Sequence, residues 1–183
     1  AWRQANAPGL DVSALKFVAI EQPVNLNSVE MLQFVSDELV KLDGVDLIVI
    51  DTFSKFVGGL DENSNADVAG FLSNISALMR DKLGATVLIV AHAGHSDASR
   101  PRGASALMAN PDAEYIVDRP VETGMSVSVT RERYKDSASL APLAYEAKEI
   151  DLNRMDRYGE SVSSLVMIGT DAVPVAHIKK GGA

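Results

Sequence analysis

The chain has 183 residues, of which 46% are hydrophobic and 23% charged, and it contains no cysteine. This composition is typical of a folded domain with a hydrophobic core, and it excludes disulfides and thiolate metal sites. Because the net charge is −8, we do not expect a uniformly basic surface for nucleic acid. No apolar run has the length of a membrane span and no signal peptide is recognisable, so we expect a cytoplasmic protein with no membrane contact.

Strand and helix signals alternate through the first half of the chain. Asp46–Asp51 is a nearly continuous apolar run, which is typical of a strand covered on both faces in a parallel sheet. Asn27 and Ser28 can cap a helix that begins at about Val29. Ser64 and Asp67 have the spacing of a capping box, and Gly84 can end the helix that follows. We predict strands over 15–20, 46–51 and 86–91, and helices over 3–7, 29–42 and 64–82.

The pattern changes after residue 92. Residues 93–103 are small and polar, which predicts a surface loop. We then predict a short helix over 104–109 and strands over 114–117, 125–131, 143–150 and 161–168. Because no helices separate these strands, we expect hairpins that extend the sheet. The chain is predicted to be one α/β domain over 1–183, without internal repeats or an interdomain linker.

Asp51 ends the apolar run at the place where parallel sheets bind ligands, beyond the carboxyl ends of their strands. A carboxylate there can hold a hydrated Mg²⁺ against a nucleotide phosphate, as a Walker B aspartate does. The alternative is an aspartate that only terminates the strand. The phosphate-cradling motif G-x-x-x-x-G-K-[ST] does not occur in the 183 residues.

Four segments in one order resemble a known family. They are Asp46–Thr52, Asp61–Asp67, Thr86–His92 and Arg102–Leu107. Together they resemble RecA-like ATPases of the plasmid RepA-type replicative helicase group, which includes phage and mobile-element AAA family ATPases. The resemblance implies a RecA-like three-layer sandwich with a mostly parallel central sheet, here with a β-rich antiparallel C-terminal extension. It also implies ATP hydrolysis with Mg²⁺, assembly into a homo-oligomeric ring, and action on single-stranded DNA.

In that family a Walker A loop and a strand carrying the catalytic glutamate come first. We therefore expect this chain to correspond to the C-terminal two thirds of such an ATPase domain, without the P-loop strand and helix. Glu21 could be read as a general base because it follows the predicted strand over 15–20, but its place in the chain order argues against this reading. We expect no ATP hydrolysis by this chain alone.

The resemblance also implies roles for residues at the strand ends. Asp51 and Thr52 would lie at the Mg²⁺ shell, and His92 would sense the γ-phosphate. In the predicted 93–103 loop, His95, Arg100 and Arg102 would face single-stranded DNA. The alternatives are a strand-end histidine with a local hydrogen bond and solvated loop arginines.

Arg131 and Arg133 stand at alternate positions of a predicted strand, so both side chains are expected on one face of the sheet. In related ring helicases such a pair reaches the γ-phosphate bound by the neighbouring subunit, as an arginine finger. Arginine suits this role because its planar fork matches phosphate oxygens. The alternative is a solvated strand face with ion pairs.

Two other functions remain open. A catalytically inactive RecA-like domain could serve as an interaction or regulatory module. A metal-dependent hydrolase using Asp51, His92 and His95 is a weaker alternative, as is a zinc site of His92, His95 and Asp97. Without a P-loop strand, exposed sheet edges and apolar surface should also favour self-association.

Overall fold

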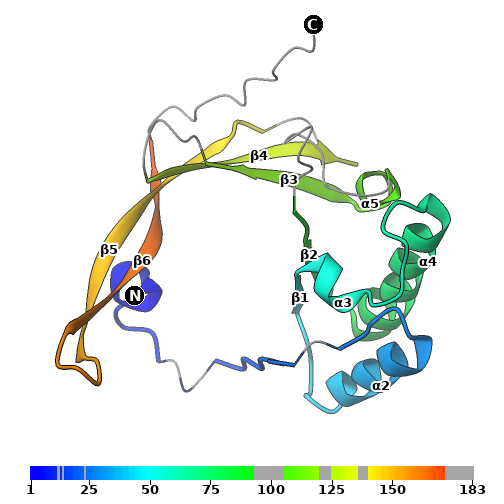
Figure 1. The fold of residues 1–183 in the computed structure, drawn as a ribbon, viewed down its shortest axis with the longest axis horizontal. Coiled ribbons are helices and arrows are strands. Elements are labelled where there is room, and N and C mark those ends of the chain that lie inside the picture. The colour runs from blue at the N-terminus through cyan, green and yellow to red at the C-terminus, as the bar shows by residue number, and fades with distance from the viewer. Residues whose placement is uncertain are drawn as a thin grey trace, which may run out of the picture. The chain divides into compact units, whose positions relative to one another are not determined.

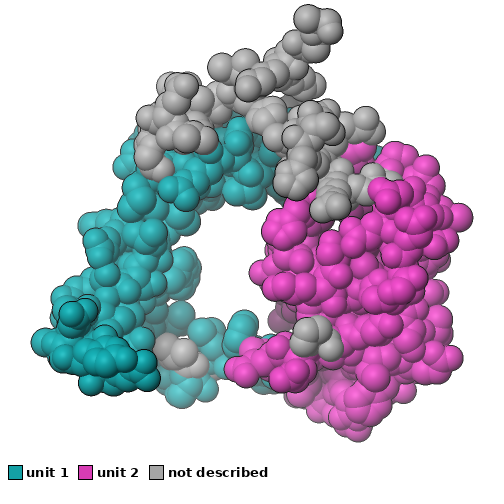
Figure 2. Space-filling model, in the orientation of Figure 1, with its two compact units in different colours: residues 1–18, 112–183 teal, residues 19–111 magenta. Residues whose placement is uncertain are grey.

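The computed structural model describes residues 1–11, 13, 15–22, 24–92, 105–119, 125–135 and 140–171. The chain divides into two compact units, one of residues 1–18 with 112–183 and one of residues 19–111 (Figures 1 and 2). The single domain expected over 1–183 stays a prediction. None of the helices in these described ranges has the length and apolar character needed to cross a membrane.

The unit of residues 19–111 alternates helices and strands, as predicted. Its elements are α2 (Val29–Val40), β1 (Leu47–Asp51), α3 (Phe53–Phe56), α4 (Asn65–Ile75), the π-helical segment η2 (Ser76–Asp81), β2 (Thr86–Val90) and α5 (Ala106–Ala109). The strands β1 and β2 pair in parallel.

Serine side chains cap two helices of this unit at the predicted residues. The Ser28 hydroxyl accepts from the Met31 amide at 3.2 Å and so caps α2. The Ser64 hydroxyl accepts from the Asp67 amide at 3.3 Å and so caps α4. The Ser64 amide donates to the Asp61 carbonyl at 3.0 Å and not to the Asp67 carboxylate, so the reciprocal bond of the predicted capping box is not formed. After η2, Gly84 has a φ of +70°, which a glycine adopts without steric cost.

One face of the β1–β2 sheet contributes to the core of this unit. Ile50 is buried, and Ile48, Val87 and Ile89 on the same face pack against the buried cluster. The rings of Phe53 and Phe71 meet edge to face with centroids 5.5 Å apart. The cluster consists of Leu26, Leu32, Ile50, Phe53, Val57, Val68, Phe71, Ile75, Met79, Ala106 and Leu107.

The opposite face of the same sheet is exposed. Leu47, Val49, Leu88 and Val90 are 37–55% accessible to solvent. Parallel sheets normally carry helices on both faces. Among the described residues of this unit the helices pack against one face, so the α/β class is confirmed and the RecA-like three-layer sandwich stays a prediction.

The other unit contains the short helix α1 (Trp2–Asn6) and four long strands. They are β3 (Ala113–Asp118), β4 (Ser126–Tyr134), β5 (Leu143–Met155) and β6 (Ser161–Thr170), and each pairs antiparallel with the next. The predicted hairpins are confirmed. The prediction that they extend the parallel sheet is wrong, because β3–β6 form a separate sheet. Strands that follow one another along the chain satisfy each other's backbone groups in such a meander.

The predicted strand over 15–20 is also wrong. Residues 15–20 have no regular secondary structure, and none of the described strands pairs with them. Leu15, Phe17, Val18 and Ile20 are 50–83% exposed. A strand is stabilised by a hydrogen-bonded neighbour, so apolar composition alone did not make this segment one.

Candidate functional site

Asp51 lies at the carboxyl end of β1, and its side chain is exposed. The next residue, Thr52, is only 7% exposed, and the peptide bond between the two is cis. The Thr52 carbonyl accepts from the Lys55 amide at 3.0 Å, at the first turn of α3. The Asp51 carboxylate is therefore accessible to a ligand, whereas the Thr52 side chain is buried at the start of the helix.

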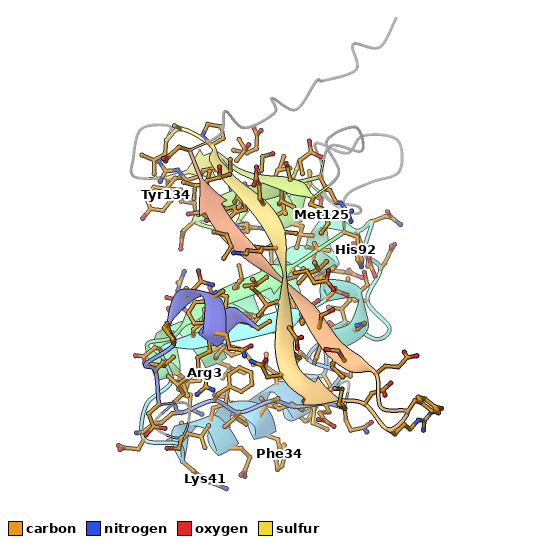
Figure 3. The ribbon with its side chains drawn as sticks, turned by 90° about the vertical axis from the view of Figure 1, so that its left-hand side faces the viewer. Arg3, Phe34, Lys41, His92, Met125 and Tyr134 are labelled. Carbon is orange, nitrogen blue, oxygen red and sulfur yellow. The ribbon has the colours of Figure 1, made fainter. Side chains whose placement is uncertain are left out.

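His92, which is labelled in Figure 3, lies beyond the carboxyl end of β2. Because β1 and β2 are parallel, this is the same end of the sheet as that of Asp51. In the parallel ladder Asp51 is the register partner of Val90, so His92 comes two residues after the residue that pairs with Asp51. The imidazole side chain is exposed. Asp51 and His92, the two predicted strand-end residues, therefore follow neighbouring strands at the same carboxyl end of the sheet.

Asn65, the first residue of α4, is a residue to which the sequence alone assigned no role. Its side-chain oxygen accepts from the Ser105 hydroxyl at 3.0 Å and from the Ala106 amide at 3.0 Å. Asn65 therefore joins the first residue of α4 to the start of α5. The sequence signalled only a polar stretch before a helix, because the partners lie about forty residues away in the chain.

The remaining loop candidates are outside the described residues. His95, Arg100 and Arg102 belong to residues 93–104, which the structure does not describe, as does Asp97 of the weaker zinc alternative. Their roles stay predictions. Asn65 holds Ser105 and Ala106, the first described residues after this stretch.

Arg131 and Arg133 lie on β4, where the strand is irregular. Glu114 of β3 pairs with Arg133, whereas Tyr115 pairs with Arg131, so Glu132 is an extra residue in β4. This is a β-bulge, and it breaks the alternation of side chains along the strand. Glu114 and Tyr115 are consecutive residues of β3 and point to opposite faces.

The prediction that the two arginines share one face is therefore wrong. Arg131 lies on the face of Tyr115, and its guanidinium carbon is 4.9 Å from the ring centre of Tyr134. Arg133 lies on the face of Glu114, and its Nε is buried. The bulge thus gives the two guanidinium groups different surroundings, so each has to be considered separately as a phosphate ligand.

The metal chemistry available at the strand ends is that of a single carboxylate. Within the described ranges, no group of three or more histidine, aspartate or glutamate side chains is arranged to hold a metal ion. Mg²⁺ keeps most of its water and needs only one or two protein carboxylates beside phosphate oxygens. The exposed Asp51 fits that requirement.

The comparisons with known proteins agree with a nucleotide-dependent function at a general level. The family model described as the AAA domain matches residues 3–98, which include β1, Asp51, β2 and His92. The AAA domain is an ATPase module, and its activity in general depends on nucleotide and Mg²⁺. No curated protein matches the chain. Because the matched residues are more than half of the 183, the chain belongs to the AAA domain family.

Proposed function

We propose that the chain is part of a RepA-like, ATP-dependent DNA helicase or related DNA-stimulated ATPase of a plasmid, phage or mobile element. The observation that supports this most is the common edge of β1 and β2, where an exposed carboxylate and an exposed imidazole follow neighbouring parallel strands. The four ordered segments of the sequence and membership of the AAA domain family support the same function.

In this proposal Asp51 would hold the water shell of Mg²⁺ beside the β- and γ-phosphates of ATP. His92 would respond to loss of the γ-phosphate, and the following loop with His95, Arg100 and Arg102 would contact single-stranded DNA in a ring of subunits. The residues that cradle the phosphates are not among these 183, so the chain by itself is not expected to hydrolyse ATP.

An arginine from the neighbouring subunit would complete the site. Arg131 and Arg133 lie on opposite faces of their sheet, so only one of them would serve as the finger for a given phosphate. An arginine finger contributes about 10³–10⁵-fold to the rate of phosphoryl transfer. The two single substitutions therefore discriminate between the candidates.

The test is DNA-stimulated ATP hydrolysis by the protein that the complete reading frame encodes. Asp51→Asn should lower kcat by at least about 100-fold, because the metal loses its carboxylate. Either Arg131→Ala or Arg133→Ala should lower kcat by about 10³-fold or more, but not both. Glu160→Gln, at an exposed turn residue, is the matched control and should leave kcat unchanged.

Subunit mixing tests the trans arrangement. Asp51→Asn subunits and subunits of the inactive arginine variant are each defective in a different half of the shared site. Mixed rings contain some interfaces with both halves intact, so partial activity should return. No recovery would contradict a site shared between subunits.

The alternative is a catalytically inactive RecA-like interaction or regulatory module. If the complete protein neither binds nor hydrolyses Mg²⁺-ATP, the enzyme proposal fails and this alternative gains support.

A further inference from the structure

Two tyrosines and an arginine come together on one face of the β3–β4 pair. Tyr115 is the register partner of Arg131, and Tyr134 is the partner of Ala113, two residues before Tyr115 on the same strand. Alternation along β3 places Ala113 and Tyr115 on one face, so Tyr115, Arg131 and Tyr134 lie on that face together. We call these three residues the tyrosine–arginine patch.

The patch is open to solvent although its side chains are large. Tyr115 is 53% exposed, and Tyr134, which is labelled in Figure 3, is 43% exposed. The Arg131 guanidinium is already within cation–π distance of Tyr134, at 4.9 Å from its ring centre. The next pair along the strands, Val117 and Val129, continues the same face with apolar side chains, and Val117 is 68% exposed.

These features fit a flat, aromatic ligand. Tyrosine rings and the guanidinium plane are the groups on which nucleobases stack in proteins that bind single strands. The apolar valines beside them offer contact to the edge of a base and no competing charge. Because the whole chain carries a net charge of −8, a general attraction for polyanions would not supply the affinity, and stacking would have to do so.

We propose that the tyrosine–arginine patch is a nucleobase-binding site. The base stacks against the rings of Tyr115 and Tyr134, and Arg131 fixes the ring of Tyr134 and attracts the phosphate attached to the base. The base belongs to a free nucleotide or to a single strand of nucleic acid, which present the same aromatic surface. This site goes beyond the proposed ATPase function, because it needs neither Asp51 nor His92. It shares Arg131 with the candidate arginine fingers, whereas Tyr115 and Tyr134 have no role in the proposed ATPase site.

The chain contains a matched control. In the turn between β5 and β6, the Arg157 guanidinium lies 4.7 Å from the ring centre of Tyr158, which is 73% exposed. This pair has the same two side chains in contact, but it lies in a turn of the β5–β6 hairpin and not on the strand face where Tyr115 and Tyr134 come together. If an exposed arginine–tyrosine contact were sufficient for binding, both places would bind equally.

The experiment measures the fluorescence of 2-aminopurine, which falls when the base stacks on an aromatic ring. The probes are a short single-stranded oligonucleotide with one 2-aminopurine, the triphosphate of 2-aminopurine riboside, and an abasic strand of the same length with a fluorescein at one end, whose anisotropy reports its binding. They are titrated with the full chain and with Tyr115→Ala, Tyr134→Ala, Tyr134→Phe, Arg131→Lys and Tyr158→Ala. Thermal melting of each variant checks that it is folded.

We expect quenching by the full chain and no binding of the abasic strand. Tyr115→Ala and Tyr134→Ala should each weaken binding by about tenfold, because each removes a stacking surface. Tyr134→Phe keeps the ring and should bind as the full chain does, as should Tyr158→Ala. Arg131→Lys should also weaken binding, because lysine keeps the positive charge but lacks the planar guanidinium group.

The probes distinguish the two sources of the base. Binding of the triphosphate assigns the patch to a free nucleotide, and binding of the oligonucleotide alone assigns it to a single strand. The proposal is overturned if neither probe binds, if the abasic strand binds equally well, or if Tyr158→Ala weakens binding as much as Tyr134→Ala. Loss of ATPase activity in Asp51→Asn bears only on the proposed function, so the two can fail separately.

Discussion

Ser36 is a fully buried polar side chain of α2. Its hydroxyl donates to the Leu78 carbonyl of η2 at 2.6 Å, which joins two helices of the unit of residues 19–111. Ser36→Ala should lower the free energy of unfolding by about 1–2 kcal/mol, because the partly buried Leu78 carbonyl loses this donor. Urea denaturation measures the change. Ser73→Ala, at an exposed position of α4, should have little effect.

An ion pair at the surface also joins α2 to the end of η2. The carboxylate oxygen of Asp37 in α2 is 2.5 Å from Nζ of Lys82, the residue that follows η2. The hydrogen bond from Lys82, with a second from Gln33, holds the pKa of Asp37 below its ordinary value. Because this pKa is lower in the folded state, the interaction stabilises the fold at pH values above the ordinary aspartate pKa of about 3.9. The stabilisation is lost as the pH falls through the pKa that Asp37 has in the folded state.

Asp37→Asn should therefore lower the urea midpoint slightly at pH 7. The difference from the unchanged chain should shrink as the pH falls below about 4, where Asp37 becomes protonated in the unfolded and then in the folded state. Lys82→Met should give a similar small loss at pH 7, and the double variant no further loss. A difference that grows toward low pH would contradict the assignment.

At the scale of elements, two glycines of the α4–η2 helix region have opposite expected responses to alanine. Gly84 ends the region with a φ of +70°, which an alanine adopts only with strain, although no atom lies within 4 Å of an added Cβ. Gly70 lies inside α4, again with nothing within 4 Å. Gly84→Ala should cost about 1 kcal/mol, whereas Gly70→Ala should stabilise by about 0.5–1 kcal/mol. Thermal melting of the two variants compares them directly.

The bulge in β4 shows how one element can separate residues that are close in sequence. A single extra residue, Glu132, moves Arg131 and Arg133 to different faces. Strict alternation in the sequence predicted the opposite arrangement. Which residue becomes extra depends on the strand that pairs with β4, and that information is not local.

At the scale of the whole molecule, the exposed face of the β1–β2 sheet predicts self-association. Val49 and Leu88 are register partners on this face, and they are 52% and 47% exposed. Exposed apolar surface of this kind tends to be covered by another surface. Sedimentation of the chain should show a concentration-dependent rise in mass, and Leu88→Glu should reduce it. Thr86→Glu is the control, because the face is already polar at that position. A concentration-independent monomer would contradict the prediction.

The sequence by itself determined the local parts of this protein. The caps of Ser28 and Ser64, the helix end at Gly84, the two strands that lead to Asp51 and His92, and the later hairpins follow from periodicity and turn chemistry within a few residues. The match of residues 3–98 to the AAA domain agrees with the function expected for those strand ends.

Only the tertiary structure decided which strands pair with which. The apolar segment over 15–20 has the composition of a strand but no described partner, and β3–β6 form a sheet of their own. Contacts between distant parts of the chain also place Arg131 and Arg133 on different faces and form the hydrogen bond between Asn65 and Ser105. The physical reason is that a strand's hydrogen bonds are made with another segment, so pairing and register are set by the whole fold.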